Sequence, residues 1–244
     1  MPNPFPDEPE HLTQRQESAI ARAEFLYRLA HTPLAEDNHA VASARESAKL
    51  VAAEVSSRTL DGFALIGIDG AGGSGKSTLA RELADILAGP DHATAATVVH
   101  GDDFYRAMDP EERLRLTPAE GYELYFDWER LREEVLAPLT SGQAADYRRY
   151  DWPGNRIAPG ERHHVPHSGF VIVEGIYTVR PELEGYYDLT VLVDTPFDVS
   201  LERLVKRGHD HGPGNWNLRW QAADKHYFAT TEPWARLDLI VKGI

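Results

Sequence analysis

The chain has 244 residues, 42% hydrophobic and 26% charged, which is typical of an ordinary globular protein of one domain with an appendage. Its formal net charge of -14 argues against a surface for nucleic-acid polymers, which require clusters of Lys and Arg, and the absence of cysteine excludes disulfides and thiol chemistry. No apolar run approaches the ~20 residues that cross a bilayer, and residues 1–8 lack the features of a signal peptide, so we expect no membrane association and a cytoplasmic protein.

The first 60 residues differ in character from the rest. After a Pro-rich start, helix-like stretches cover residues 11–30 and 35–58, with Ala and apolar residues along one face. We interpret residues 1–60 as a helical extension that packs on the core or on another subunit, which leaves a homo-oligomer open, and residues 61–244 as the main domain. A regulatory or partner-binding role for the extension is the alternative.

A complete phosphate-binding loop follows an apolar, strand-like run at residues 63–68. Residues 70–77 read Gly-Ala-Gly-Gly-Ser-Gly-Lys-Ser, and residues 76–87 have helical spacing, so the loop lies between a strand and a helix. Glycines let backbone N–H groups surround a β-phosphate, Lys76 supplies a cation for the β- and γ-phosphates, and the Ser77 hydroxyl is a Mg²⁺ ligand. The predicted nucleotide-binding residues are Gly70, Ala71, Gly72, Gly73, Ser74, Gly75, Lys76, Ser77 and Thr78. We therefore predict ATP and Mg²⁺ as cofactors; a chance glycine-rich turn is the alternative.

Two aspartates closely follow the strand predicted over residues 96–100. A carboxylate at such a strand end can face a γ-phosphate and accept the proton of an attacking hydroxyl. We predict Asp102 as the catalytic base, with an Asp-Asp turn or helix cap as the alternative.

Residues 107–125 and 144–167 are rich in charged and aromatic side chains, Gly and Pro. Segments at the carboxyl ends of strands commonly hold the substrate site of an α/β protein. His163, His164 and His167 gather in the second segment, and His209 and His211 occur later, but no Cys or carboxylate stands at ligand spacing, so we predict polar loops rather than a zinc site.

Acidic and basic groups follow the next two strands, predicted over residues 169–174 and 189–194. Glu174 ends a buried strand, where a carboxylate anchors Mg²⁺ and positions water; a plain strand terminus is the alternative. In the helix predicted over residues 196–207, Arg203 and Arg207 share one face and are predicted to cover the transferring phosphoryl group as a lid; a solvated helix face is the alternative.

The remaining elements are a helix over residues 217–228 and a strand over residues 237–242, with an earlier helix over residues 127–138. Strands and helices thus alternate from residue 62 onward. This pattern predicts an α/β fold: a doubly wound, mainly parallel five-stranded sheet with flanking helices, a small lid and the N-terminal helical extension.

The order of these motifs resembles the uridine kinase and phosphoribulokinase family of P-loop kinases. The resemblance runs from residue 63 to the C-terminus and includes Asp-Asp-Phe-Tyr after the second strand, Tyr-Asp-Trp at residues 150–152 and Val-Glu-Gly-Ile-Tyr at the end of the third. It implies ATP-dependent phosphorylation of a substrate hydroxyl, with Asp102 as the catalytic aspartate and Tyr105 and Tyr150 as substrate contacts.

The resemblance is interrupted where uridine kinases carry an Asp-His-Pro element that holds the ribose hydroxyls. This chain has Glu120-Gly-Tyr-Glu-Leu-Tyr there, so Glu120 or Glu123 is the candidate replacement. The lid sequence also differs, at residues 206–214. We therefore predict a kinase whose acceptor is a nucleoside, with another small alcohol, such as pantothenate, nicotinamide riboside, a sugar phosphate or a secondary metabolite, as the alternative. A nucleotide-dependent ATPase switch that uses the N-terminal helices is the rival from another class.

Overall fold

The computed structural model describes residues 44–58, 62–89, 94–160, 162–208 and 215–243. The helix predicted over residues 11–30, the first part of the one predicted over residues 35–58, and His209 and His211 of the predicted lid lie outside the described residues. Within the described ranges, none of the helices has the length and apolar character needed to span a bilayer.

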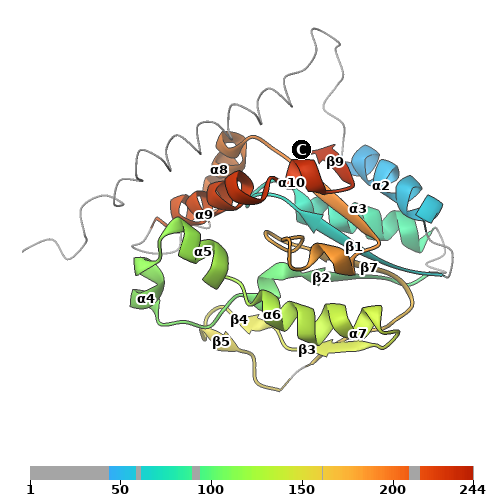
Figure 1. Cartoon of the computed structure of the whole chain (residues 1–244), viewed down its shortest axis with the longest axis horizontal. Coiled ribbons are helices and arrows are strands. Elements are labelled where there is room, and N and C mark those ends of the chain that lie inside the picture. The colour runs from blue at the N-terminus through green and yellow to red at the C-terminus, as the bar shows by residue number, and fades with distance from the viewer. Residues whose placement is uncertain (1–43, 59–61, 90–93, 161, 209–214, 244) are drawn as a thin grey trace, which may run out of the picture.

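Five parallel strands form the central sheet in the order β2-β7-β1-β8-β9 (Figure 1). They are β1 (Phe63–Asp69), β2 (Ala96–His100), β7 (Gly169–Glu174), β8 (Leu189–Asp194) and β9 (Leu239–Lys242). The predicted strands are therefore confirmed, except that the last one starts at Leu239. The difference arises because Asp238 donates its N–H to Thr190 Oγ1 and accepts two hydrogen bonds from Thr190, in place of ladder bonds.

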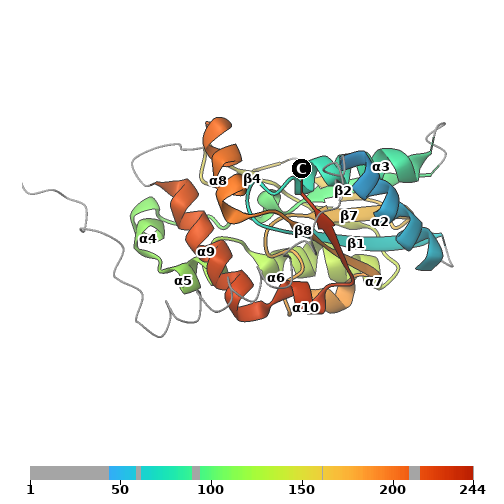
Figure 2. The ribbon, with the colours of Figure 1, turned by 90° about the horizontal axis from the view of Figure 1, so that it is seen from above.

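Helices cover both faces of the sheet (Figures 1 and 2). They are α2 (Ala44–Arg58), α3 (Lys76–Ala88), α4 (Pro110–Arg115), α5 (Pro118–Leu124), α6 (Trp128–Leu131), α7 (Ala137–Thr140), α8 (Phe197–Lys206), α9 (Trp216–Thr231) and α10 (Pro233–Arg236). A π-helical turn, η2 (Arg132–Leu136), joins α6 to α7, and single 3-10 turns are η1 (Gly101–Phe104) and η3 (Glu184–Tyr186). The doubly wound α/β fold predicted from the sequence is confirmed.

Alternating side chains divide the core between the two faces. Ile66 of β1 packs with α2 and α3, whereas its neighbour Leu65 packs with α6, η2 and α7, because successive residues of a strand point to opposite faces. Helix α2, the described part of the predicted extension, contributes the buried Val51 and Val55 to the first of these cores. This helix therefore packs on the core of the sheet and α3, while the boundary near residue 60 stays a prediction.

The segments expected to be substrate-site loops contain short regular elements. Asp109 and Thr117 cap α4 and α5, each followed by Pro, and Thr117 forms a capping box with Glu120. Residues of the second segment form two antiparallel hairpins, β3 (Ala145–Tyr147) with β6 (His163–Val165) and β4 (Tyr150–Asp151) with β5 (Arg156–Ile157). Such short elements carry little periodic signal, because their stability comes from caps and tertiary packing.

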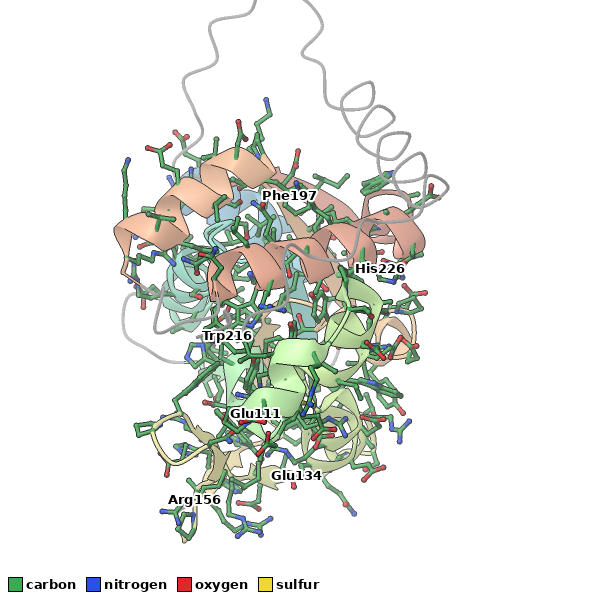
Figure 3. The ribbon with its side chains drawn as sticks, turned by 90° about the vertical axis from the view of Figure 1, so that its left-hand side faces the viewer. Glu111, Glu134, Arg156, Phe197, Trp216 and His226 are labelled. Carbon is green, nitrogen blue, oxygen red and sulfur yellow. The ribbon has the colours of Figure 1, made fainter. Side chains whose placement is uncertain are left out.

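A third core, rich in aromatic residues, lies at the carboxyl end of the sheet. Figure 3 shows α9, with Trp216 and His226 near its two ends, alongside α4 and α5. The contact of α5 with α9 is close, because a Cβ on Gly121 would lie only 3.2 Å from the Cβ of Ala223. Helix α9 therefore closes the end of the sheet at which the predicted site residues gather.

Candidate active site

The phosphate-binding loop leaves β1 at Gly70 and enters α3 at Lys76, as predicted. Gly73 and Gly75 have φ angles of 82° and 103°, a region that residues with a Cβ rarely adopt. A Cβ on Gly73 would also overlap the backbone oxygen of Ser200 in α8. Glycine is therefore required at Gly73 both for its conformation and for the close approach of α8.

Lys76 and Ser77 lie at the N-terminus of α3, where unpaired backbone N–H groups favour anions. The Lys76 Nζ atom donates a hydrogen bond to the Ala71 carbonyl over 2.9 Å, so the ammonium lies across the loop. Ser77 Oγ donates to Glu174 Oε2 over 3.1 Å. The phosphate loop and the predicted metal anchor thus meet in the folded chain.

The register of the sheet explains why Glu174 reaches both neighbours. Glu174 is paired with Ile68 of β1 on one side and with His100 of β2 on the other. Its second oxygen, Oε1, lies 2.7 Å from His100 Nδ1, and this hydrogen bond raises the pKa of His100. Glu174 is only 5% exposed, and both of its carboxylate oxygens are hydrogen-bonded to protein groups.

Asp102 follows in η1, next to this pair. Its side chain is exposed, yet protein atoms surround it closely enough that desolvation raises its pKa, and the carboxylate of Glu174 raises it further. Lys76 and His100 act in the opposite direction. A carboxylate with a raised pKa is a stronger base, and Asp102 remains accessible to a ligand.

The neighbouring Asp103 has a different environment from that of Asp102. Its Oδ2 atom accepts a hydrogen bond from Tyr147 Oη over 2.9 Å and forms an ion pair with Arg149 at 3.2 Å. These contacts hold Asp103 toward the β3 hairpin, so the two adjacent aspartates occupy distinct surroundings.

The two predicted lid arginines lie on α8 and at its C-terminal cap. Arg203 Nη1 is 3.4 Å from the carbonyl oxygen of Gly73, so this side chain already contacts the phosphate loop. Arg207 is exposed at the end of the helix. The role of each as a lid cation stays a prediction.

Aromatic rings surround Tyr105, one of the predicted substrate contacts. The Tyr105 ring is stacked on Trp152 with 4.6 Å between ring centroids and is packed edge-to-face against Tyr150 at 5.3 Å. Trp220 Nε1 donates to Tyr105 Oη over 3.1 Å, and Tyr150 Oη donates to Asn155. Tyr105 is only 1% exposed, whereas Trp152, which covers it, is 47% exposed.

Glu120 and Glu123, the candidates for ribose binding, both have partners within the protein. Glu120 Oε2 accepts hydrogen bonds from the Thr117 hydroxyl and backbone amide at the start of α5. Glu123 pairs with Arg180 at 2.9 Å. The roles of Glu120 and Tyr150 in substrate binding remain predictions.

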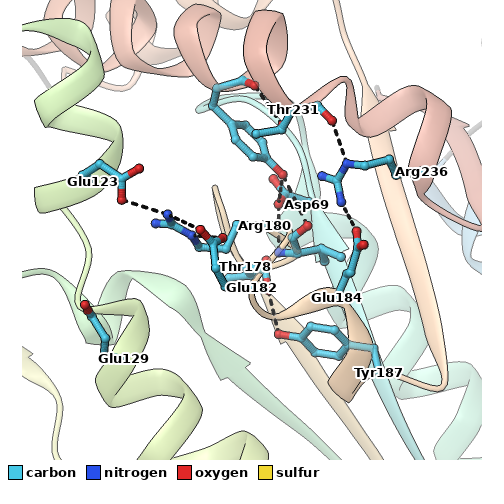
Figure 4. Close-up of polar contacts among 12 residues, drawn as sticks. Asp69, Glu123, Glu129, Thr178, Arg180, Glu182, Glu184, Tyr187, Thr231 and Arg236 are labelled. Atoms are coloured by element: carbon cyan, nitrogen blue, oxygen red, sulfur yellow. Dashed lines mark hydrogen bonds and ion pairs between the residues drawn. The ribbon is translucent and has the colours of Figure 1, made fainter.

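Arg180 is a buried cation that the sequence analysis did not single out. Its guanidinium lies 4.4 Å from the ring centroid of Tyr122 and 4.6 Å from that of Trp128, and it pairs with Glu123 and Glu182 (Figure 4). These contacts join the segment after β7 to α5 and α6. Arg180 thus connects the strand that carries Glu174 with the helices of the predicted substrate site.

Two buried aspartates also contact the loop and were missed by the sequence analysis. Asp69, which is labelled in Figure 4, lies at the centre of a set of hydrogen bonds. It accepts from the backbone N–H groups of Gly70, Tyr177 and Val179 and from Tyr227 Oη, and its burial raises its pKa. Asp224 of α9 accepts the Gly72 N–H over 2.9 Å. The position of Asp69 directly before the loop was the one available signal, because Asp224 lies 152 residues from Gly72.

The donor set suits Mg²⁺ bound together with a nucleotide. Mg²⁺ prefers oxygen ligands and is held through one or two protein groups plus substrate phosphates and water. Ser77 and Glu174 supply such oxygens, whereas the described part of the chain contains no group of three or more His, Cys, Asp or Glu side chains arranged to hold a metal ion. Ser77 and Glu174 therefore fit a metal that binds with the phosphates.

The parallel sheet, the phosphate loop at the end of β1 and the carboxylates at the ends of β2 and β7 define the P-loop class of α/β nucleotide-binding folds. The model of the phosphoribulokinase / uridine kinase family matches residues 65–212. The chain belongs to this family, as the motif order predicted.

Individual relatives agree with this assignment. A uridine kinase from Halobacterium salinarum is 31% identical over 151 residues, which cover 61% of this chain and 64% of the relative. A solved structure of a possible uridine kinase from Bacillus stearothermophilus is similar in fold, with a TM-score of 0.61 at 23% identity, covering 81% of this chain and 98% of that one. A putative fructose transport system kinase from Silicibacter has the same TM-score at 26% identity, covering 79% of this chain and 98% of that one.

Proposed function

We propose that this protein is an ATP- and Mg²⁺-dependent kinase that transfers the γ-phosphoryl group to a hydroxyl of a small molecule, and that the acceptor is a nucleoside. The contact that carries the proposal is the one between Ser77 and Glu174, because it joins the phosphate loop to the metal anchor beside Asp102. The aromatic rings around Tyr105 support a planar acceptor, and the uridine kinases among the relatives support a nucleoside.

In the proposed reaction, the backbone amides of the loop and Lys76 bind the phosphates of ATP, while Ser77 and Glu174 would hold Mg²⁺, which would neutralise charge on the phosphates. The acceptor oxygen forms a bond to the γ-phosphorus, the bond from that phosphorus to the β,γ-bridging oxygen breaks, and ADP leaves. Asp102 takes the proton of the acceptor hydroxyl. Arg203 and Arg207 stabilise the negative charge of the transferring group.

Two contacts favour a second acceptor class, namely a small alcohol that carries no nucleobase. The Glu120 carboxylate is engaged in a helix cap, so it can bind ribose hydroxyls only if it gives up that cap. Tyr105 and Trp152 are stacked directly on each other, so a flat base fits between them only after Trp152 moves. The putative fructose transport system kinase among the structural neighbours is consistent with this class.

The test is to incubate the protein with ATP and Mg²⁺ and a panel of nucleosides, pantothenate, nicotinamide riboside and sugar phosphates, and to detect products by mass. A phosphorylated nucleoside, including nicotinamide riboside because it carries a flat base, supports the first acceptor class. A phosphorylated alcohol that lacks such a base, with no nucleoside product, supports the second. Slow ATP hydrolysis that is independent of every acceptor, with a nucleotide-dependent oligomeric state, would contradict both and favour the ATPase switch. Lys76→Ala is the control for contaminating kinases.

A further inference from the structure

The α9 helix supplies a buried carboxylate to the phosphate loop that the proposed reaction does not use. Asp224 is 4% exposed. Its Oδ2 atom accepts the Gly72 N–H over 2.9 Å, and its Oδ1 atom accepts the Tyr177 hydroxyl over 2.8 Å. Gly72 belongs to the phosphate loop, and Tyr177 belongs to the segment after Glu174. Asp224 therefore joins the two segments that form the nucleotide and metal sites.

The segment that Tyr177 occupies is conformationally costly. Tyr177 has a φ angle of 62°, which is strained for a residue with a side chain, and its N–H is held by Asp69. Its hydroxyl is held by Asp224. The two buried carboxylates therefore stabilise the same strained residue from opposite ends while each also holds an amide of the loop.

Several charged or titratable groups surround Asp224. Lys76 of α3 attracts its negative charge and Asp69 of β1 repels it. Tyr177 donates a hydrogen bond to it, and Tyr125 is close enough to interact with its charge. From α8, Arg203 approaches the carbonyl of Gly73, the next residue of the loop. Burial nevertheless dominates and raises the pKa of Asp224 to about 6. Lys76 is thus the main nearby cation among these groups that favours the charged form.

Nucleotide phosphates change this balance, because they add negative charge and engage Lys76. One unit of negative charge about 7 Å away, at an effective dielectric constant of about 20, raises the pKa of a carboxyl by roughly one or more. We propose that Asp224 positions the phosphate loop through the Gly72 amide and takes up a proton when nucleotide phosphates occupy the loop; this inference rests on the proposed nucleotide binding.

The hydrogen bonds of Asp224 are compatible with this proton. A proton from bulk solvent forms an O–H bond at Oδ1, which then donates to Tyr177 Oη, while the hydrogen of the tyrosine hydroxyl rotates away from Oδ1. Oδ2 continues to accept the Gly72 N–H. The loop therefore keeps its anchor while the repulsion between the carboxylate and the phosphates disappears.

The experiment is calorimetric titration of the full-length protein with ADP in EDTA, in buffers with different ionisation enthalpies, at pH 6.5 and pH 8.5. Omitting the metal avoids competition with His100 for Glu174, and protons exchanged by ADP or by groups that the variants share cancel when the variants are compared. For a pKa that rises by about one from about 6, wild type takes up about half a proton more than Asp224→Asn at pH 6.5, and almost none more at pH 8.5. When the pH rises from 6.5 to 8.5, the ADP affinity of wild type falls about threefold more than that of Asp224→Asn.

Two further variants sharpen the test. Asp146→Asn, a surface change on β3, is the matched control and keeps the wild-type proton uptake. Tyr177→Phe removes a hydrogen bond that favours the charged carboxylate, so the pH of greatest uptake moves upward, and this variant serves if Asp224→Asn does not fold. Two results would overturn this inference but not the proposed function. One is ADP binding with equal proton uptake in wild type and Asp224→Asn; the other is ADP binding by Tyr177→Phe with its greatest uptake at the wild-type pH. Absence of nucleotide binding in wild type overturns the proposed function as well.

Discussion

Ser77 Oγ donates a hydrogen bond to Glu174 Oε2 over 3.1 Å, which joins residues 97 positions apart in the chain. The contact exists because β1 and β7 are adjacent parallel strands whose carboxyl ends meet at one edge of the sheet. A hydroxyl and a carboxylate at this position are suited to hold Mg²⁺ beside a bound triphosphate.

Replacement of this carboxylate should weaken the use of the metal. We expect Glu174→Gln to raise the free Mg²⁺ concentration needed for half-maximal activity by roughly 10- to 100-fold, because an amide oxygen carries no net charge. Phosphoryl transfer measured over a Mg²⁺ titration checks this. Glu133→Gln, on the exposed side of η2, is the control, and equal Mg²⁺ dependence in the two variants would refute the assignment.

Removal of the loop lysine should abolish transfer while preserving the fold. Lys76 makes one hydrogen bond, to Ala71, in the free protein, but in the proposed reaction it stabilises charge on the phosphates. We expect Lys76→Ala to lower kcat by orders of magnitude with little change in thermal melting. Lys49→Ala, on the exposed face of α2, is the control. A near-normal kcat for Lys76→Ala would rule out this role.

The two adjacent aspartates give an internal comparison for the base. We expect Asp102→Asn to retain ATP binding and to lose about 10²- to 10⁴-fold in turnover, because an amide cannot accept the hydroxyl proton. Asp103→Asn, which loses the ion pair with Arg149 and weakens the hydrogen bond from Tyr147, should lose less turnover and more thermal stability. Turnover and ATP affinity, measured separately for each variant, distinguish these effects. A larger loss of turnover in Asp103→Asn than in Asp102→Asn would assign the base to Asp103.

The phosphate loop should be sensitive to an added methyl group. Gly73 and Gly142 have similar φ angles of 82° and 79°, but a Cβ on Gly142 meets nothing, whereas one on Gly73 overlaps Ser200. Gly142→Ala should therefore cost about 1–2 kcal/mol of stability from backbone strain alone. Gly73→Ala should cost more and should also weaken nucleotide binding, which denaturant unfolding and ADP titration would detect. Equal effects in both variants would contradict close packing of α8 on the loop.

The buried Asp224 should make stability depend on pH. Its pKa is about 6 in the folded protein and near 3.8 in a solvated chain, so the folded state binds its proton more tightly. Its contribution to stability is therefore fully present below about pH 4 and is lost as the pH rises through 6, by an amount on the order of 3 kcal/mol. Denaturant unfolding of wild type and Asp224→Asn from pH 4 to pH 8 checks this. We expect the asparagine variant to gain stability relative to wild type as the pH rises; a constant difference would be inconsistent with this titration.

The sequence by itself determined the sheet, the loop and the family. Strands such as β2, β7 and β8 are apolar runs that end in polar residues, and the loop between β1 and α3 is a contiguous motif, so local spacing specifies them. Asp102 and Glu174 could be nominated for the same reason: each follows or ends a recognisable strand, and the carboxyl ends of parallel strands share one edge.

Only the tertiary structure decided the contacts that depend on distant segments. Asp224 gives no signal in the sequence, because it lies on an ordinary helix and acquires its role when α9 packs against the phosphate loop. The stacking of Trp152 on Tyr105 and the cap that occupies Glu120 likewise depend on side-chain placement rather than spacing. Burial, charge and hydrogen bonding at the site are properties of neighbours in space, and a linear pattern specifies these only where the neighbours are also close in the chain.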